Sequence, residues 1–369
     1  MTRIPAFFVI LALSCPAVKA QSSHARHLAV IAYYAGRSTA VDSFPMGELT
    51  HVIFSFSHLN GNRLSIMNAR DSATLLALVA LKHDHPRLKV IVSLGGWGGC
   101  KTCSDVFSTD SGRHDFVQSA KELLTNFGAD GIDLDWEYPA LASVPGYAYY
   151  PADRDNFTAV VRLLRKTLGK KAEISFAAGG FTDYLRTCID WKQVAPLVNH
   201  INLMTYDLVN GYATGTGHHT ALYSTPQQVE STDHTIRWLD SAGVPLNKLA
   251  IGMAFYARVF SGVDSIDNGL YRPGHFFRGV SYKDQATVLS PDSGYVYHRD
   301  KVAQAPYMYN ASRGLFATLD DSASIRIKTE YAIRKGLGGV MFWQMTEDRF
   351  SGGLLDVIAN TKTKMEGGR

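Results

Sequence analysis

The residues most able to do chemistry are three carboxylates at alternate positions, Asp133, Asp135 and Glu137. The residues between them are apolar or aromatic, which is typical of a buried β-strand. Side chains on a strand alternate between its two faces, so the carboxylates would share one face at a spacing of about 6.6 Å. Three acidic groups in a partly desolvated row cannot all ionise easily, so at least one pKa should rise. A carboxylic acid kept protonated near neutral pH can donate its proton to a leaving group.

Two other interpretations of this stretch are an exposed acidic strand edge and a calcium loop. The apolar residues on the opposite face leave little solvated surface, which argues against an exposed edge. An EF-hand loop needs a glycine after its third acidic position and a distant glutamate, and Gly131 does not occupy that place. We therefore predict an acid/base site, and expect neither a metal nor a cofactor.

Composition and the first residues define the class of protein. The chain has 369 residues, 46% hydrophobic and 19% charged, as in a folded globular protein. Residues 1–20 are typical of a signal peptide, because Arg3 precedes an apolar run and small residues end the segment. Their removal would delete Arg3 and Lys19 and lower the formal charge from +4 to +2, which gives no indication of nucleic-acid binding. We expect a secreted protein, extracellular or periplasmic, without a membrane anchor.

Three cysteines would remain after the leader is removed: Cys100, Cys103 and Cys188. In an exported protein an oxidised pair is expected, and Cys100 and Cys103 are the closest in sequence. A redox-active Cys-x-x-Cys is the alternative, but the surrounding sequence lacks a thioredoxin-like pattern. We predict a structural disulfide between Cys100 and Cys103, with Cys188 free and buried.

Eight short apolar runs recur along the chain, separated by stretches with helical spacing such as Asp155–Leu168 and Ser322–Lys335. Buried strands that alternate with helices predict a closed parallel (β/α)₈ TIM barrel. An open doubly wound sheet is the alternative, but no glycine-rich phosphate turn follows the first strand. The predicted strands are Leu28–Tyr34, His51–Phe56, Lys89–Gly95, Gly131–Glu137, Glu173–Gly179, His200–Tyr206, Lys248–Phe255 and Gly339–Gln344.

The last two predicted strands are separated by a much longer interval than the others. We expect residues 258–316, rich in Gly, Tyr and Asp, to form a small α+β lobe beside the mouth of the barrel. Residues 21–257 and 317–369 would then make up the barrel. Catalytic groups of such barrels lie at the carboxyl ends of the strands, where Glu137, Tyr206 and Trp343 are expected.

The segment 130–139, DGIDLDWEYP, resembles the DxxDxDxE signature of glycoside hydrolase family 18, the chitinases and their relatives. Four further blocks resemble family motifs in the same order: 93–97, SLGGW; 204–207, MTYD; 256–258, YAR; and 338–343, GGVMFW. Ala257 departs from the usual glycine. The resemblance covers most of residues 27–360, and the 258–316 lobe is similar to the α+β insertion of the deep-cleft chitinases.

The resemblance implies a substrate-assisted, retaining mechanism. Glu137 would protonate the glycosidic oxygen, and the substrate's own acetamide oxygen would attack the anomeric carbon to give an oxazolinium ion. Asp135 would orient the acetamide through its N–H, Asp133 would share a proton with Asp135, and Tyr206 would donate to the acetamide oxygen. Asp130 completes the signature and is included as a supporting residue.

The same resemblance assigns a group of side chains to the sugar. Trp343 would form the floor of the cleavage subsite, because pyranose rings pack on large aromatic faces. Tyr33 and Ser93 would hydrogen-bond the Asp133 end of the row, since alternation lets only one of Tyr33 and Tyr34 face the interior. The other expected substrate-binding residues are Trp97, Phe56, Tyr212, Met204, Asp207, Tyr256 and Arg258.

Two further expectations concern the backbone and the histidines. Relatives carry cis peptide bonds at positions that match Ser55-Phe56, Glu137-Tyr138 and Trp343-Gln344. His218 and His219 follow the sixth predicted strand and are interpreted as loop residues rather than metal ligands.

The predicted function is a secreted chitinase, a monomer acting on β-1,4-linked N-acetylglucosamine polymers or oligomers. One alternative is an endo-β-N-acetylglucosaminidase that acts on N-glycans. Another is a chitin-binding lectin without catalysis, but Glu137 is retained, whereas such relatives usually lose the acid. Endo or exo action and the natural polymer are not determined by the sequence.

Overall fold

Eight parallel strands close into a barrel in the computed structural model, which describes residues 27–367. The first strand pairs with both the second and the last, so this sheet has no free edge. The predicted TIM barrel is therefore confirmed, whereas the predicted signal peptide, residues 1–20, lies outside the described residues. The barrel strands are β1 (Ala29–Tyr34), β2 (His51–Asn60), β4 (Lys89–Gly95), β5 (Gly131–Asp135), β6 (Glu173–Gly179), β7 (His200–Met204), β8 (Leu249–Ala254) and β14 (Gly339–Trp343).

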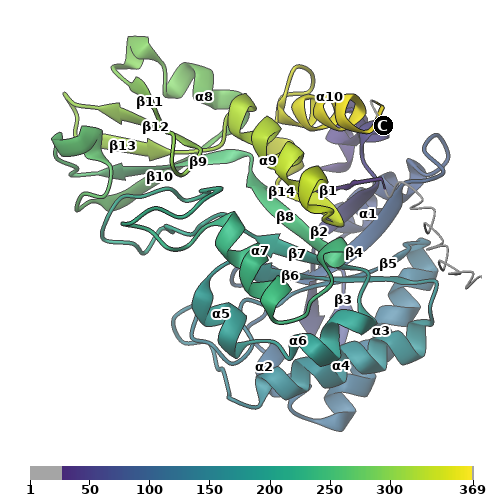
Figure 1. Cartoon of the computed structure of the whole chain (residues 1–369). Helices are drawn as coiled ribbons and strands as arrows, with labels where there is room; N and C mark the ends of the chain where they lie inside the picture. The colour runs from purple at the N-terminus through teal and green to yellow at the C-terminus, as the bar shows by residue number, and fades with distance from the viewer. Residues whose placement is uncertain (1–26, 368–369) are drawn as a thin grey trace, which may run out of the picture.

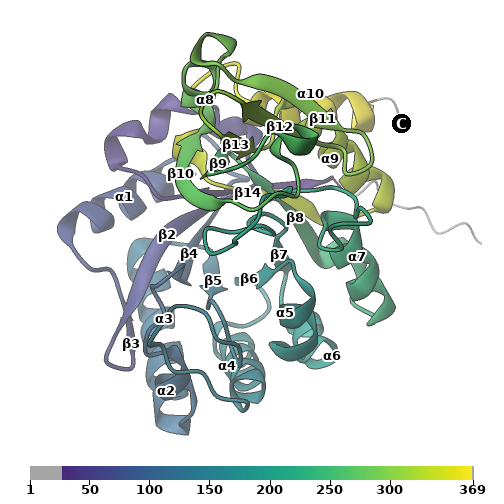
Figure 2. The same ribbon diagram turned by 90° about the vertical axis from the view of Figure 1, so that its left-hand side faces the viewer.

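Helices surround the strands, as Figures 1 and 2 show. The apolar spacing in 155–168 and 322–335 gives α4 and α9, and α9 starts at a capping box formed by Asp321 and Ser324. Among residues 27–367, no helix combines the length and apolar composition needed to cross a membrane. The helices are α1 (Ala69–Ala80), α2 (Cys103–Phe107), α3 (Asp110–Phe127), α4 (Asp153–Leu168), α5 (Thr182–Thr187), α6 (Trp191–Val194), α7 (Thr232–Ser241), α8 (Tyr282–Val288), α9 (Ser322–Lys335) and α10 (Leu354–Gly367).

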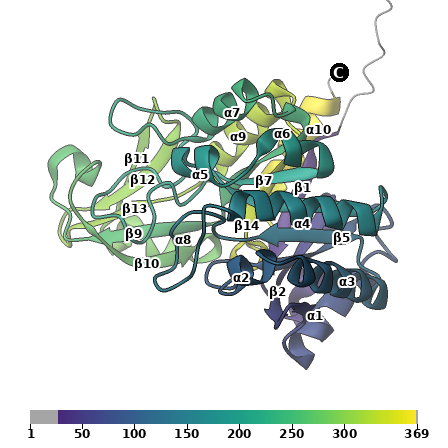
Figure 3. The same cartoon turned by 90° about the horizontal axis from the view of Figure 1, so that it is seen from below.

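A lobe stands between β8 and β14 and extends to one side of the barrel in Figures 1 and 3. It is an antiparallel sheet in the order β10-β9-β13-β12-β11, with α8 after β10. The barrel chain passes almost directly into this sheet, because β8 ends at Ala254 and β9 begins at Tyr256. The strands of the lobe are β9 (Tyr256–Ser261), β10 (His275–Ser281), β11 (Val296–Asp300), β12 (Ala305–Asn310) and β13 (Leu315–Thr318).

Three barrel strands end two or more residues away from the predicted position. Pairing of β5 with β4 stops at Asp135, so Glu137 lies in the following loop rather than in the strand. Similarly, β7 ends at Met204 because the next residue folds back, its N–H bonding Leu203 O. Strand β2 instead runs on past residue 56 to Asn60, forming a hairpin with β3 (Arg63–Ser65).

Alternate residues of each barrel strand fill the interior in layers. Ile31, Ile53, Ile91, Ala250 and Met341 pack together inside the barrel. The opposite faces of the same strands pack against the helices in a larger apolar cluster. This separation leaves the few polar interior positions without bulk water, where each must find a protein partner.

The cysteine pairing agrees with the prediction. Cys100 and Cys103 form a disulfide between β4 and α2, and Cys188 is free and buried. The three expected peptide bonds, Ser55-Phe56, Glu137-Tyr138 and Trp343-Gln344, are all cis.

Candidate active site

Strand β5 brings two of the carboxylates into the barrel interior. Asp133 is fully buried and Asp135 is 4% exposed. In the register of the sheet, Asp133 lies beside Ser93 of β4 and Ser175 of β6. Glu137 follows two residues after the end of the strand and is half-buried. The carboxylates thus run from the closed interior toward the open end of the barrel.

Asp133 accepts hydrogen bonds at both of its oxygens. Oδ1 accepts from the Ser175 hydroxyl at 2.6 Å and from Asn202 Nδ2 at 3.2 Å. Oδ2 accepts from the Ser93 hydroxyl at 2.8 Å and from the Tyr33 hydroxyl at 3.1 Å. Burial raises the pKa of Asp133, and these hydrogen bonds oppose the increase by stabilising the ionised form. Such a set of donors can hold a buried negative charge.

Asp135 and Glu137 have the opposite kind of environment. Asp135 Oδ1 is buried and has no hydrogen-bond partner among the described residues. Burial, followed by repulsion from Glu137 and Asp133, raises the pKa of Asp135 well above its ordinary value. Burial also raises the pKa of Glu137 to about 7, although a hydrogen bond with Tyr138 opposes this. Both groups can therefore hold a proton at pH values where exposed carboxylates have lost theirs.

Tyr206 forms another wall of the interior. It follows β7 and is 8% exposed, with its hydroxyl 3.9 Å from Met341 Sδ and its ring 6.2 Å from that of Tyr256. Burial, then the charges of Asp135 and Glu137, raise the pKa of its hydroxyl, so the group keeps its proton. Met204 ends β7 and packs half-buried against the same interior cluster.

Asp207 ties the barrel to the lobe. It accepts a hydrogen bond from the Tyr256 hydroxyl at 2.7 Å, and Arg258 donates to both of its oxygens. Burial alone would raise the pKa of Asp207, but the hydrogen bonds from Arg258 outweigh burial and hold it well below its usual range. His219 Nδ1 lies 3.5 Å from Asp207 Oδ1. Asp207 is thus an ionised, positioned acceptor.

Aromatic rings form two groups at this end of the barrel. Trp343 is stacked on Phe56, with ring centroids 5.6 Å apart, and lies 5.9 Å from Tyr33. Trp97 lies 6.1 Å from Tyr212, and the two side chains are 50% and 65% exposed. Exposed aromatic rings that already contact one another offer a platform for an apolar face of a ligand.

One predicted supporting residue lies apart from this assembly. Asp130 precedes β5 and accepts from the Val90 N–H at 2.9 Å, while Lys82 Nζ lies 2.9 Å from it. It therefore acts at the beginning of the strand, and Glu137 follows the other end. The other predicted residues converge around the carboxyl ends of the strands.

Several residues of the site were missed by the sequence prediction. Ser175 and Asn202 supply two of the four donors to Asp133, and both are polar residues within otherwise apolar strands. That signal was available, because each has the strand phase of an interior residue. The interpretation of His218 and His219 as simple loop residues is incomplete, since both are fully buried, with His218 Nε2 3.0 Å from Asp300. Their partners are distant in sequence, so no local pattern identified them.

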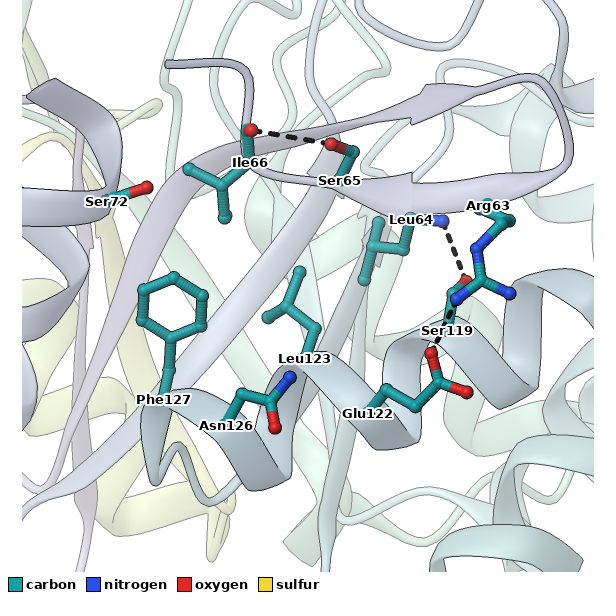
Figure 4. Close-up of a pocket in the computed structure, with 10 residues that line it drawn as sticks. All are labelled: Arg63, Leu64, Ser65, Ile66, Ser72, Ser119, Glu122, Leu123, Asn126 and Phe127. Carbon is teal, nitrogen blue, oxygen red and sulfur yellow. Dashed lines mark hydrogen bonds and ion pairs between the residues drawn. The ribbon is translucent and has the colours of Figure 1, made fainter. Parts of the chain in front are cut away.

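A separate hollow of about 300 Å³ lies between the β2–β3 hairpin and α3 (Figure 4). Arg63 and Glu122 form an ion pair at its rim, and both side chains are largely exposed. Its lining contains none of the carboxylates or aromatic rings described above. It is not part of the candidate active site.

Comparison with known proteins shows the family. Residues 29–348 match the model of the glycosyl hydrolases family 18. Chitinase A1 of Niallia circulans is 32% identical over 293 residues, which cover 73% of this chain and 42% of that protein. Chitotriosidase-1 of Mus musculus is 31% identical over 340 residues, covering 86% of this chain and 71% of that protein. The chain thus spans less than half the length of the first of these relatives.

A solved structure of nearly the same size agrees with these matches. It is a glycoside hydrolase family 18 N-acetylglucosaminidase from Paenibacillus barengoltzii, with a TM-score of 0.82 and 31% sequence identity. The match covers 90% of this chain and 99% of that one. The chain belongs to glycosyl hydrolase family 18.

Proposed function

We propose that this protein is a secreted chitinase that hydrolyses β-1,4-linked N-acetylglucosamine chains with retention of anomeric configuration. The observation that carries the proposal is the difference in hydrogen-bond donors and pKa among the three carboxylates. Asp133 is supplied with donors, whereas Asp135 and Glu137 have raised pKa values. A site of this kind holds a proton beside a fixed negative charge, as acid catalysis at a glycosidic bond requires.

In the proposed reaction Glu137 is the general acid. Its proton passes to the glycosidic oxygen as the bond to the anomeric carbon breaks, and the alcohol leaves. The carbonyl oxygen of the substrate's acetamide attacks that carbon and forms an oxazolinium ion. Water then adds at the anomeric carbon while Glu137 takes back a proton, so the acetamide is restored. The two displacements together give retention.

The neighbours of Glu137 would position the acetamide. Asp135 would accept its N–H, and Tyr206 would donate its hydroxyl to the acetamide oxygen, which fixes the attacking geometry. Asp133 would let charge build toward Asp135 as the oxazolinium ion forms, by sharing the proton that Asp135 holds at rest. The donors around Asp133 favour its ionised form, which is consistent with Asp135 holding the proton at rest.

The surrounding surface supports a chain of sugars as the substrate. Trp343 and Phe56 offer a stacked aromatic floor, and Trp97 and Tyr212 offer further exposed rings. Asp207 provides an ionised acceptor, and the lobe that carries Arg258 extends beside the barrel. Two of the relatives above are named as chitinases or chitotriosidases, which favours chitin over N-glycans.

Export and a monomeric state belong to the same proposal. The leader-like residues 1–20 and the Cys100–Cys103 disulfide both favour an oxidising compartment. A monomer is favoured because a single chain holds every group assigned to the chemistry. Mass analysis of the exported protein tests both: we expect an amino terminus near residue 21 and the mass of one chain.

The decisive experiment compares wild type with Glu137→Gln on N-acetylglucosamine oligomers, following the product anomer by NMR. We expect initial release of the β-anomer and a loss of rate of about 10²–10⁴-fold in the variant, with binding retained. Turnover of glycoproteins but not oligomers would instead favour the endo-β-N-acetylglucosaminidase. Binding without turnover by the wild type would favour a lectin.

A further inference from the structure

The floor of the barrel, at the opposite end from the aromatic rings, carries a polar cluster that the proposed chemistry does not use. His51, Glu173 and His200 are the first residues of β2, β6 and β7. Two positions later in β6 and β7 stand Ser175 and Asn202, which reach into the interior to the buried carboxylate of β5. Because strand side chains alternate, Glu173 and His200 face the same interior one layer below.

The three side chains converge. One ligand-type atom from each lies within 4.8 Å of those of the other two. The imidazole rings of His51 and His200 meet edge to face, with centroids 4.9 Å apart. Tetrahedral zinc with ligands at 2.0–2.1 Å brings ligand atoms to roughly 3.4 Å from one another. Small side-chain rotations would shorten the distances between the ligand atoms to this value.

Two atoms of the cluster have no partner. Glu173 Oε2 and His200 Nδ1 are buried and make no hydrogen bond within residues 27–367. Lys89 and Arg165 are close enough to attract the Glu173 carboxylate, but within the described residues neither hydrogen-bonds to it. Lys89 Nζ lies 3.7 Å from Asp130, and Arg165 donates to backbone carbonyls. A buried carboxylate oxygen and a buried imidazole nitrogen without partners are unfavourable unless a ligand satisfies them.

The Thr50 hydroxyl contacts the imidazole ring of His51. The Thr50 hydroxyl donates its one proton to Val30 O at 3.0 Å and accepts from Val30 N–H at 2.9 Å. His51 Nδ1 lies 2.8 Å from the same hydroxyl oxygen. When the hydroxyl proton points to Val30 O, Nδ1 is the protonated nitrogen and the lone pair is on Nε2, where it can bind a metal. A second hydrogen bond of this kind is what orients imidazole ligands at metal sites.

We propose that His51, His200 and Glu173 form a binding site for one divalent transition-metal ion, of which zinc fits best. Two imidazoles and a carboxylate are ligands that zinc accepts, and the remaining position would be taken by water. The ion would join β2 to β6 and β7 across the barrel floor. Its role would be structural, since the residues assigned to glycoside hydrolysis gather at the other end.

The test uses the full-length protein, freed of metal by a chelator and dialysed. Co²⁺ serves as a spectroscopic probe and Zn²⁺ as the calorimetric ligand. We expect one ion of each per chain, the visible absorption of low-coordinate cobalt, and a Tm raised by several degrees in excess Zn²⁺. Hydrolysis of oligomers should not require the ion.

Matched variants identify the ligands. His200→Asn and Glu173→Gln should each weaken binding at least tenfold, and Glu173→Gln still decides the matter if His200→Asn does not fold. His83→Asn is the control, because His83 has a largely exposed side chain paired with Asp84 on the surface. Binding that is absent from the wild type, or unchanged in both ligand variants, would overturn the proposal.

Discussion

Asp133 and Asp135 stand two residues apart on one strand, yet Asp133 accepts four hydrogen bonds while Asp135 Oδ1, also buried, accepts none from the described residues. No hydrogen bond joins the two side chains within residues 27–367. The arrangement favours negative charge at Asp133 and a proton at Asp135, although burial raises the pKa of both. The two carboxylates differ in their preference for a proton more because of their hydrogen-bond donors than because of their burial.

Removing one donor to Asp133 should affect catalysis. Tyr33→Phe deletes the bond from the hydroxyl at 3.1 Å, which should destabilise ionised Asp133 by about 1 kcal/mol. We expect kcat/KM for oligomers to fall about fivefold, since a difference of 1.36 kcal/mol is tenfold. Tyr34→Phe is the control, because Tyr34 donates to Arg37 O instead. Equal losses of activity in the two variants would contradict this reading of the donors.

Activity should decline as the pH rises through about 7. Glu137 must be protonated to act as the acid, and burial raises its pKa to that value. A profile of kcat/KM against pH, with oligomers as substrate, should show this alkaline limb. A limb displaced to about pH 4–5 would mean that Glu137 titrates like an exposed carboxylate.

The same raised pKa predicts a stability effect with a defined sign. An unfolded chain has a glutamate pKa of about 4.3, so between that value and about 7 the folded protein binds more protons at Glu137. Stability from this group is therefore complete below about pH 4 and is lost as the pH rises toward 7. Glu137→Gln removes the titration, so its Tm relative to wild type should increase from pH 5 to pH 8. A constant difference in Tm would argue against the shift.

The Asp207–Arg258 pair should contribute strongly to stability. Arg258→Ala leaves a partly buried carboxylate without its main partner, and we expect unfolding in urea to show a loss of about 2–4 kcal/mol. Arg63→Ala is the matched control, since Arg63 and Glu122 are both largely exposed, and its loss should stay below about 1 kcal/mol. Asp207→Asn in the Arg258→Ala background should recover part of the loss, because the unpaired charge is then removed.

Trp97 should bind sugar units away from the cleaved bond. Trp97→Ala should raise KM for long oligomers about 3- to 10-fold and leave kcat nearly unchanged, because one stacking contact is lost. Phe350→Ala is the control: Phe350 is also exposed but packs on Phe44. A fall in kcat with KM unchanged would place Trp97 at the reacting sugar instead.

The barrel was predictable because its physical signal is repeated eight times. Buried parallel strands need continuous apolar runs, and each run in the sequence corresponds to a strand. Their ends were less predictable: β5 stops at Asp135 and β7 at Met204, where pairing with neighbours ceases. The periodicity of apolar residues predicts which face of the strand a side chain occupies. It does not predict the residue at which pairing with a neighbouring strand ends.

The residues of the candidate site were also only partly predictable from the sequence. Alternation alone indicated that one of Tyr33 and Tyr34 faces the interior, and the family resemblance selected Tyr33, which does contact Asp133. His219 does lie in a loop, as predicted, but its burial beside Asp207 was not foreseen, because the turn after β7 brings the two residues close together. Contacts that depend on tertiary packing leave no local trace in the sequence.

The short passage from β8 to β9 limits how the lobe can be exchanged between relatives. Tyr256 and Arg258 belong to the first strand of the lobe sheet, yet both bind Asp207 of the barrel. In a chimera, residues 258–316 would be replaced by the lobe of another protein. The Asp207 carboxylate would keep its ion pair only if that lobe carried an arginine at the position of Arg258. An exchange of the lobe is therefore safest when Asp207 and Arg258 are transferred together. The segment to be exchanged then includes part of the barrel as well as the lobe.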